Sequence, residues 1–417
     1  MSIIVFGKGL SILLSLIGLN MITHLLTPEE YGLFSLYLTI SSLGILSIYG
    51  PIGQGVVRFY VIARERKMLK SYQKTLVELL RNGTLLIVLL SLTGMFWLFL
   101  QKKEEWLYIL PLVCILSCTE GSNFVLSMVQ NSARNRVLVA FHEVLDKILK
   151  IIIPYLFLIL LSRNSISTLL GFVVVAIIVL GSQVFFLRQK EAKLDNYSNL
   201  GNHLKLREDI IRFTTPFAFL SLFSWLRFNS DKWIISYILG TKAVGTYSAL
   251  YQIGFQPLNL LTITLSQLLL PVLFEIAEDG KNTVKLKNAQ ILNGKFIVLF
   301  TFFVVFLVLL SFCFSSNVIQ ILLGSTYEQQ SYILPYLVIA GGLYGGESFI
   351  TNQALINVKS HTLVFSRIFT GVSNIFFCYI GTFYFGMIGL VVGLILNSLL
   401  FYVLIFYKFN YDSFINN

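Results

Sequence analysis

Long apolar runs, separated by short polar segments, make up most of the chain. Each run approaches the ~20 mostly apolar residues that a membrane-spanning helix needs. The runs lie at residues 3–26, 33–57, 83–100, 107–130, 137–161, 167–187, 214–238, 245–272, 294–314, 331–356, 363–383 and 386–407. This pattern predicts an all-α polytopic membrane protein with about 12 transmembrane helices.

The sequence after the first apolar run recurs after the seventh. Leu, Gly, an aromatic residue and Ser follow one another at the same spacing, as Leu26, Gly32, Phe34 and Ser35 and again as Leu239, Gly245, Tyr247 and Ser248. The alternative is a chance similarity between the turns of two helix hairpins. The matching place within each half favours duplication of a six-helix unit. We therefore expect two pseudo-symmetric six-helix lobes, residues 1–187 and 213–417, joined by a polar cytoplasmic linker at 188–212.

Composition and charge exclude several classes of protein. Hydrophobic residues make up 56% of the chain and charged residues 12%, against roughly 25% charged residues in soluble proteins. With a cytoplasmic N-terminus, almost all Lys and Arg residues of the connections lie inside, and the outside keeps only Lys102, Lys103, Arg163 and Lys242. The positive-inside rule then predicts that both termini are cytoplasmic. The net charge of +11 is thus a topology signal, and nucleic acid is not an expected partner.

Enzyme motifs are absent from the sequence. It contains neither the G-x-x-x-x-G-K-[ST] loop that binds ATP nor the H-E-x-x-H motif of metalloproteases. The four cysteines lie inside apolar runs without neighbouring His ligands, so neither a metal site nor another cofactor is predicted. We expect a transporter that uses an ion gradient, of H⁺ or Na⁺, or a gradient of the substrate itself.

Charged residues inside the apolar runs mark the candidate site, because each costs ~2.5–3.5 kcal/mol at the centre of a membrane helix. In the fifth run, Glu143, Asp146, Lys147 and Lys150 share one helix face. The spacing predicts i,i+4 ion pairs of Glu143 with Lys147 and of Asp146 with Lys150. We interpret this face as the lining of a wet cavity. The alternative is a self-neutralised stripe that packs against another helix.

Further charges lie in the fourth, seventh and tenth runs. Arg227 and Asp231 are one helical turn apart, which predicts an ion pair with either a structural or a gating role. Glu120 and Glu347 occupy corresponding places in the two halves. Each is either a site for a proton or cation or a structural, hydrogen-bonded carboxylate. The candidates for ion coupling or gating are Glu120, Glu143, Asp146, Asp231 and Glu347.

Three segments resemble a known family. They are Leu25-Leu-Thr-Pro-Glu-Glu-Tyr-Gly-Leu-Phe-Ser35, the stretch from Asp231 to Gly240, and Val244-Gly-Thr-Tyr-Ser-Ala249. Together with twelve spans and a basic central loop, they resemble the bacterial polysaccharide (O-antigen type) flippases of the multidrug/oligosaccharidyl-lipid/polysaccharide exporter superfamily. The resemblance implies two lobes around a central cavity in the cytoplasmic membrane. It also implies a substrate of undecaprenyl-pyrophosphate-linked oligosaccharide units, turned from the inner to the outer leaflet.

The resemblance also gives the charged residues a role. A lipid pyrophosphate needs cations, and the candidates are Lys147, Lys150 and Arg227, with Arg58 at the cytoplasmic mouth. Expected partners are the lipid-linked oligosaccharide, membrane lipids, and candidate polysaccharide polymerase and chain-length proteins. One alternative is a cation-coupled drug antiporter of the same superfamily. Another is a membrane polysaccharide polymerase, which would need a large outside loop that this sequence lacks.

Overall fold

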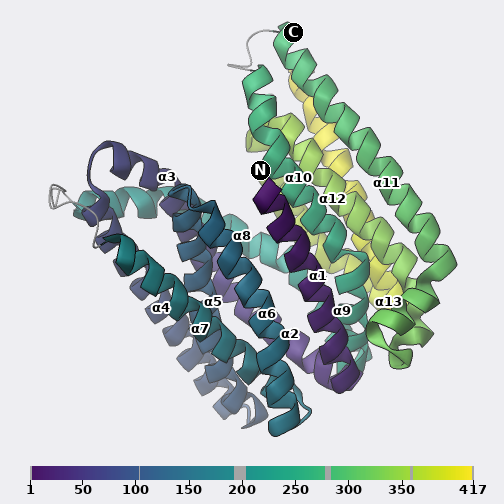
Figure 1. The fold of residues 1–417 in the computed structure, drawn as a ribbon. Coiled ribbons are helices and arrows are strands. Elements are labelled where there is room, and N and C mark those ends of the chain that lie inside the picture. Colours follow the sequence, from purple (N-terminus) through teal and green to yellow (C-terminus); the bar gives the residue numbers. More distant parts are fainter. Residues whose placement is uncertain (1, 103, 192–202, 278–282, 357–359, 416–417) are drawn as a thin grey trace. The chain divides into compact units, whose positions relative to one another are not determined.

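The computed structural model describes residues 2–102, 104–191, 203–277, 283–356 and 360–415 of the chain (Figure 1). All regular elements in this part of the chain are helical, which confirms the predicted all-α fold. In chain order they are α1 (Ser2–Leu25), α2 (Pro28–Gly44), the π-helical turn η1 (Ile45–Tyr49), α3 (Gly50–Glu65), α4 (Leu69–Leu100), α5 (Glu104–Ser132), α6 (Arg136–Leu160), α7 (Ser165–Glu191), α8 (His203–Leu239), α9 (Thr241–Gly254), α10 (Gln256–Ala277), α11 (Thr283–Leu323), the 3-10 turn η2 (Ser325–Ile333), α12 (Leu334–Ile356) and α13 (Ser360–Ile415).

The helices are long and apolar enough for a multi-pass membrane protein. Within the described residues, eight helical segments meet the length and hydropathy of a membrane span. A shorter apolar helix, Gly9–Leu25, precedes them. The eight segments are Pro28–Glu65, Leu69–Leu100, Trp106–Ser132, Ser165–Leu187, Thr241–Ala277, Thr283–Leu323, Ser325–Ile356 and Leu363–Tyr407. The number of twelve crossings stays a prediction.

The first repeated motif is a helix start. Thr27 has extended backbone and its hydroxyl accepts a hydrogen bond from the backbone N–H of Glu30 at 3.3 Å. Pro28 occupies the first turn of α2, where no backbone N–H is required. Glu29 and Glu30 place negative charge at the positive end of the helix dipole. In the second copy, Gly240 separates α8 from α9 with a φ of 85°.

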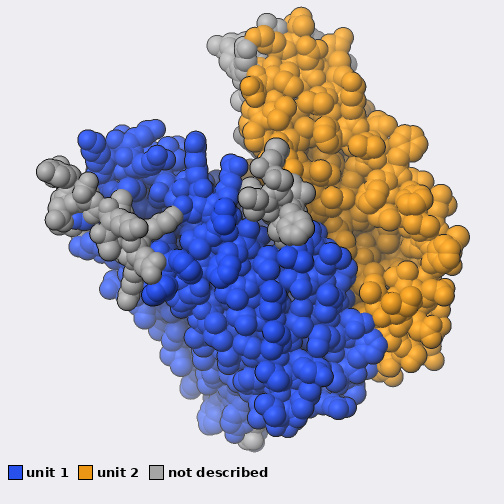
Figure 2. Space-filling view, in the orientation of Figure 1, with its two compact units in different colours: residues 1–225 blue, residues 226–417 orange. Residues whose placement is uncertain are grey.

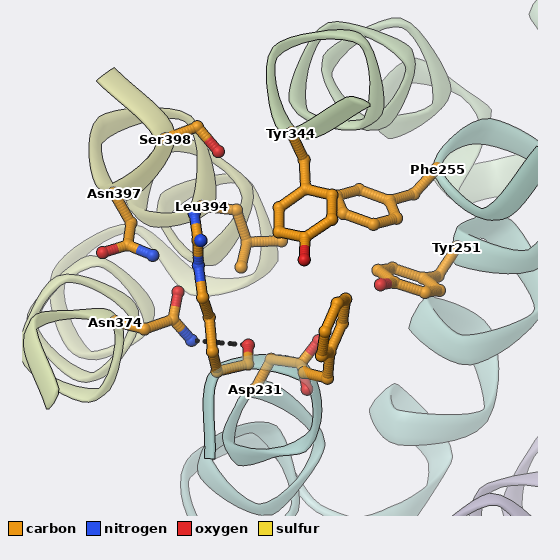
Figure 3. Close-up of a pocket in the computed structure, with 10 residues that line it drawn as sticks. Asp231, Tyr251, Phe255, Tyr344, Asn374, Leu394, Asn397 and Ser398 are labelled. Atoms are coloured by element: carbon orange, nitrogen blue, oxygen red, sulfur yellow. Dashed lines mark hydrogen bonds between the residues drawn. The ribbon is translucent and has the colours of Figure 1, made fainter. Parts of the chain in front are cut away.

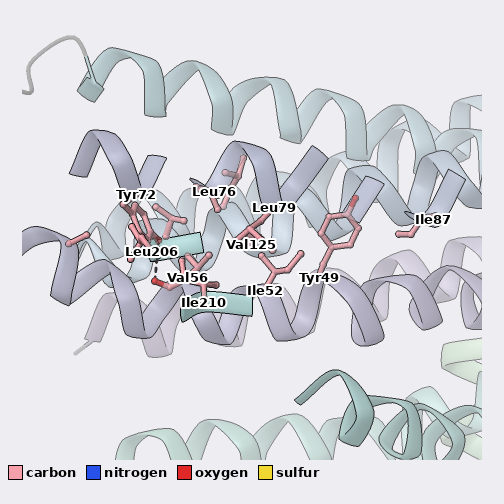
Figure 4. Packing of buried hydrophobic residues seen from close by; sticks show 13 residues of the cluster. Tyr49, Ile52, Val56, Tyr72, Leu76, Leu79, Ile87, Val125, Leu206 and Ile210 are labelled. Carbon is pink, nitrogen blue, oxygen red and sulfur yellow. Dashed lines mark hydrogen bonds between the residues drawn. The ribbon is translucent and has the colours of Figure 1, made fainter. Parts of the chain in front are cut away.

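The chain forms two compact units, residues 1–225 and 226–417 (Figure 2). The boundary lies within α8, whereas the sequence placed the second lobe from residue 213 onward. The first part of α8 packs into unit 1, because Leu206 and Ile210 are buried in the same apolar cluster as Val56 and Tyr72 (Figure 4). Residues 192–202 of the predicted linker lie outside the described residues.

In unit 2, α13 is divided into two arms at Gly386, which has a φ of 60°. The arms pack backbone to backbone at two glycines. A Cβ added to Gly389 would collide with the carbonyl group of Gly381, and a Cβ added to Gly381 would collide with the carbonyl group of Gly389. A Cβ on Gly393 would lie 2.7 Å from the carbonyl oxygen of Phe377. Small residues permit such close helix packing inside a membrane. The division falls between the predicted runs 363–383 and 386–407.

We expect Gly389→Ala to destabilise the protein, because the added methyl group must push the two arms of α13 apart. Overpacking of this kind costs about 1–3 kcal/mol. Gly181→Ala in α7 is the matched control, since nothing lies within 4 Å of the Cβ it would add. Thermal unfolding of the two purified variants measures the difference. Equal unfolding temperatures would show that the arms separate at little cost.

Candidate functional site

Unit 2 contains a buried ion pair between α8 and α12. The guanidinium of Arg227 donates two hydrogen bonds to the carboxylate of Glu347, at 2.8 and 2.6 Å. The two side chains are only 9% and 7% exposed. The guanidinium also lies over the ring of Tyr344, 4.8 Å from its centroid. A planar guanidinium suits this bidentate contact, which holds α8 to α12 and neutralises two buried charges.

The predicted pairing of Arg227 with Asp231 is therefore wrong. Asp231 is 1% exposed, and its carboxylate accepts a hydrogen bond from the hydroxyl of Tyr247 at 2.5 Å. It also accepts one from the backbone N–H of Lys232 at 2.8 Å. Sequence spacing identifies neighbours on one helix only, whereas both residues found their main partners on other helices, α12 and α9.

A small cavity adjoins this ion pair (Figure 3). Its volume is about 20 Å³, which is room for about one water molecule. This space is too small for a pyrophosphate group beside Arg227. The lining residues are Arg227, Phe228, Asp231, Tyr251, Phe255, Tyr344, Asn374, Leu394, Asn397 and Ser398.

Unit 1 contains a second charge cluster, between α5 and α6. The ammonium of Lys150 lies 2.7 Å from the carboxylate of Glu120 and 2.9 Å from that of Asp146. Lys147 approaches Asp146 less closely, at 3.5 Å. The i,i+4 pair of Asp146 with Lys150 is thus confirmed. The two glutamates that the sequence singled out as counterparts, Glu120 and Glu347, each pair with a cation on another helix of their own unit.

Two further candidate residues, Glu143 and Arg58, are not part of these ion pairs. Glu143 is half-buried on α6 and, within the part of the chain that the structure describes, makes no ion pair or hydrogen bond. Its predicted pairing with Lys147 is not formed, because Lys147 pairs with Asp146 instead. Arg58 is exposed on α3, and its guanidinium lies 4.4 Å from the ring centroid of Phe213.

The contacts divide the four candidate cations into two kinds. Arg227 and Lys150 are held at short distance by carboxylates on other helices. Lys147 is the most exposed charge of its cluster, with 35% of its side chain accessible, and Arg58 contacts an aromatic ring rather than an acid. Carboxylates at 2.6–2.9 Å already neutralise Arg227 and Lys150, so these two cations are less available to an anion than Arg58 or Lys147, whose contact with Asp146 is longer at 3.5 Å.

Several residues around the unit 2 cavity could not be identified from the sequence. Tyr344 and Ser398 lie within apolar runs, where nothing distinguishes a cavity-facing polar group from a packed one. Tyr247 is different, because it stands in the repeated Gly-x-aromatic-Ser motif and Phe34 takes its place in the first copy. That difference is a signal that the second half alone needs a hydroxyl there. Among the described residues, no group of three or more His, Cys, Asp or Glu could hold a metal ion.

Long apolar helices with buried, paired charges define an all-helical, multi-pass membrane protein, and comparison with known proteins identifies its family. The family described as "Polysaccharide biosynthesis protein" matches residues 1–277, well over half of the chain. The protein therefore belongs to this family, as the resemblance in its sequence predicted. Over 277 residues it is 23% identical to the amylovoran biosynthesis protein AmsL of Erwinia amylovora, covering 64% of this chain and 69% of that protein.

Solved structures show the same fold. The lipid II flippase MurJ, in an inward closed conformation, superposes with a TM-score of 0.70 and 15% identity, over 98% of this chain and 88% of that one. A multidrug resistance MATE family transporter of the MOP superfamily, in an inward-facing conformation, gives a TM-score of 0.67 and 14% identity, over 95% and 94% of the two chains. The family assigns the protein to polysaccharide biosynthesis, and these structures show that it has the fold of MurJ and of MATE transporters.

Proposed function

We propose that the protein is a flippase that moves undecaprenyl-pyrophosphate-linked oligosaccharide units across the cytoplasmic membrane by alternating access. The observation that carries this proposal is the family match over residues 1–277. The likeness to a lipid II flippase supports it, since that protein has the same fold. The product of this transport is used for surface polysaccharide such as O-antigen or capsule.

In this function the four cations have different tasks. Lys147 and Arg58 bind the pyrophosphate group, because phosphate oxygens accept strong charge-assisted hydrogen bonds from cationic side chains. Lys150 and Arg227 hold helices together through Glu120, Asp146 and Glu347. Binding must differ between the inward and outward states, because a ligand with equal affinity for both states shifts no equilibrium.

A gene deletion tests the function. We expect the deletion strain to lose surface polysaccharide and to accumulate lipid-linked oligosaccharide in the inner leaflet, with both effects reversed by the intact gene. A drug antiporter, the function for which MATE-like transporters are named, would instead change drug susceptibility without this accumulation. Unchanged levels of lipid-linked oligosaccharide would refute the flippase proposal.

We also propose that both termini lie in the cytoplasm, which follows from the asymmetric distribution of Lys and Arg. The test uses single cysteines in a variant without the four native ones. A cysteine at Asn288, exposed near the start of α11, should be protected from a membrane-impermeant thiol reagent in intact cells. One at Gln329, exposed in η2, should be labelled. The reverse pattern would invert the topology and place the basic loops outside.

A further inference from the structure

One end of unit 1 carries an excess of exposed positive charge. The turn between α3 and α4 and the start of α8 meet here, since Tyr72 and Leu206 are buried in one cluster (Figure 4). We define the basic end by its exposed cations, Arg64, Arg66, Lys67, Lys74 and Lys205. The exposed acids on the same segments are Glu65, Glu208 and Asp209.

The predicted duplication of the chain supplies an internal comparison for this charge. In the first half, the loop region 58–82 contains seven Lys or Arg residues and two Glu residues. The corresponding region of the second half, 271–295, contains four Lys residues and three acids. Both regions follow the second span of their half and have the same predicted orientation. A nearly neutral loop is therefore sufficient at this place in the topology, and the surplus charge in unit 1 needs another explanation.

The backbone points to the same conclusion. Among the described residues, the non-glycine residues with positive φ are Lys67, Lys102 and Arg134, all in unit 1 and all cationic. Lys67 follows α3 with a φ of 54°, a conformation that costs a residue with a Cβ roughly 1–2 kcal/mol. In unit 2 the positive-φ positions described are all glycines. Lys67 therefore stands at a helix end where glycine would adopt the same conformation at lower cost.

Exposed apolar side chains accompany these cations within one helical turn. Val61 is 51% exposed three residues before Arg64, Val77 is 64% exposed three residues after Lys74, and Leu204 is 60% exposed beside Lys205. Cations next to exposed apolar residues at the end of membrane helices match the boundary between lipid headgroups and acyl chains. A soluble acidic protein would leave these apolar side chains uncovered.

We infer that the basic end of unit 1 binds the anionic headgroups of membrane phospholipids. Five cations spread over three helix ends suit several singly charged headgroups better than one pyrophosphate. Each cation near an anionic membrane surface raises the affinity about fivefold. This lipid surface is separate from the charge cluster on α5 and α6 and does not depend on the proposed substrate.

The test measures lipid binding to the full-length protein purified in a neutral detergent. The probes are dioctanoyl phosphatidylglycerol, which is anionic, and dioctanoyl phosphatidylcholine, which has the same tails without net charge. We expect the wild type to bind the anionic lipid more tightly, and to lose this preference at high salt because the headgroup contacts are screened. If the wild-type protein binds the two lipids with equal affinity, the inference is wrong, and the results with the variants cannot rescue it.

A matched pair of variants locates the surface. Arg66→Gln with Lys74→Gln should weaken binding of the anionic lipid by about 25-fold, which is about fivefold for each cation removed. Lys287→Gln with Lys295→Gln, which removes two exposed cations from α11 of unit 2, should leave it unchanged. Equal weakening in both variants would assign the effect to net charge and overturn the assigned surface. Displacement of the lipid by millimolar inorganic pyrophosphate would make the surface a polyphosphate site instead.

Discussion

Arg227→Gln should reduce the amount of folded protein in the membrane, and Glu347→Gln should do the same. Each change removes one partner of an ion pair whose side chains are only 9% and 7% exposed. Leaving one charge of a buried pair without its partner typically costs about 3–5 kcal/mol. That loss is a large part of the 5–15 kcal/mol that stabilises a typical domain. Immunoblots of membranes and thermal unfolding in detergent measure the effect.

The double variant Arg227→Gln with Glu347→Gln tests the physical reason. It removes both charges at once, so its stability should recover most of the way to that of the wild type. Lys242→Gln, which removes an exposed cation near the start of α9, is the control and should be neutral. If Arg227→Gln instead keeps full stability and loses transport, Arg227 contacts the substrate and the structural role assigned to it is wrong.

Lys150→Gln and Lys147→Gln should differ sharply, although the two lysines lie one turn apart on α6. Without Lys150, the carboxylates of Glu120 and Asp146 lose the cation that both contact within 3 Å. We expect this variant to be destabilised by about 3–5 kcal/mol. The triple variant Glu120→Gln, Asp146→Asn, Lys150→Gln removes all three charges of this contact and should recover most of its abundance in the membrane. Lys147 then loses its contact with Asp146, but it is the most exposed charge of the cluster.

Without Lys147, Asp146 keeps Lys150 as its partner, so the protein should accumulate normally. Transport should fall, because a charge-assisted bond to phosphate contributes about 1.5–3 kcal/mol, which is roughly a ten- to hundredfold change. Surface polysaccharide per molecule of membrane protein is the measurement for both variants. Normal polysaccharide in Lys147→Gln would reduce the charged face of α6 to helix packing and would leave Arg58 as the candidate for binding pyrophosphate.

The all-helical fold and the family were accessible from the sequence, because both depend on local patterns. Apolar runs of spanning length have one structural solution in a membrane, where every backbone group must find its partner within the segment. The Leu26–Ser35 motif could also be interpreted from the sequence, because Thr27 and Pro28 favour the start of the helix to which they belong. Asp146 and Lys150 pair as their spacing predicts, because an i,i+4 contact needs only the helix itself.

Local sequence patterns were therefore enough to predict the apolar helices, the family and the charged residues inside the apolar runs. How those charges pair depends on the three-dimensional structure. It joined Arg227 to Glu347, Lys150 to Glu120 and Asp231 to Tyr247, and it placed the first part of α8 in unit 1. Each of these contacts links residues distant in sequence, and helical periodicity specifies the face of a helix but not the neighbouring helix that covers it.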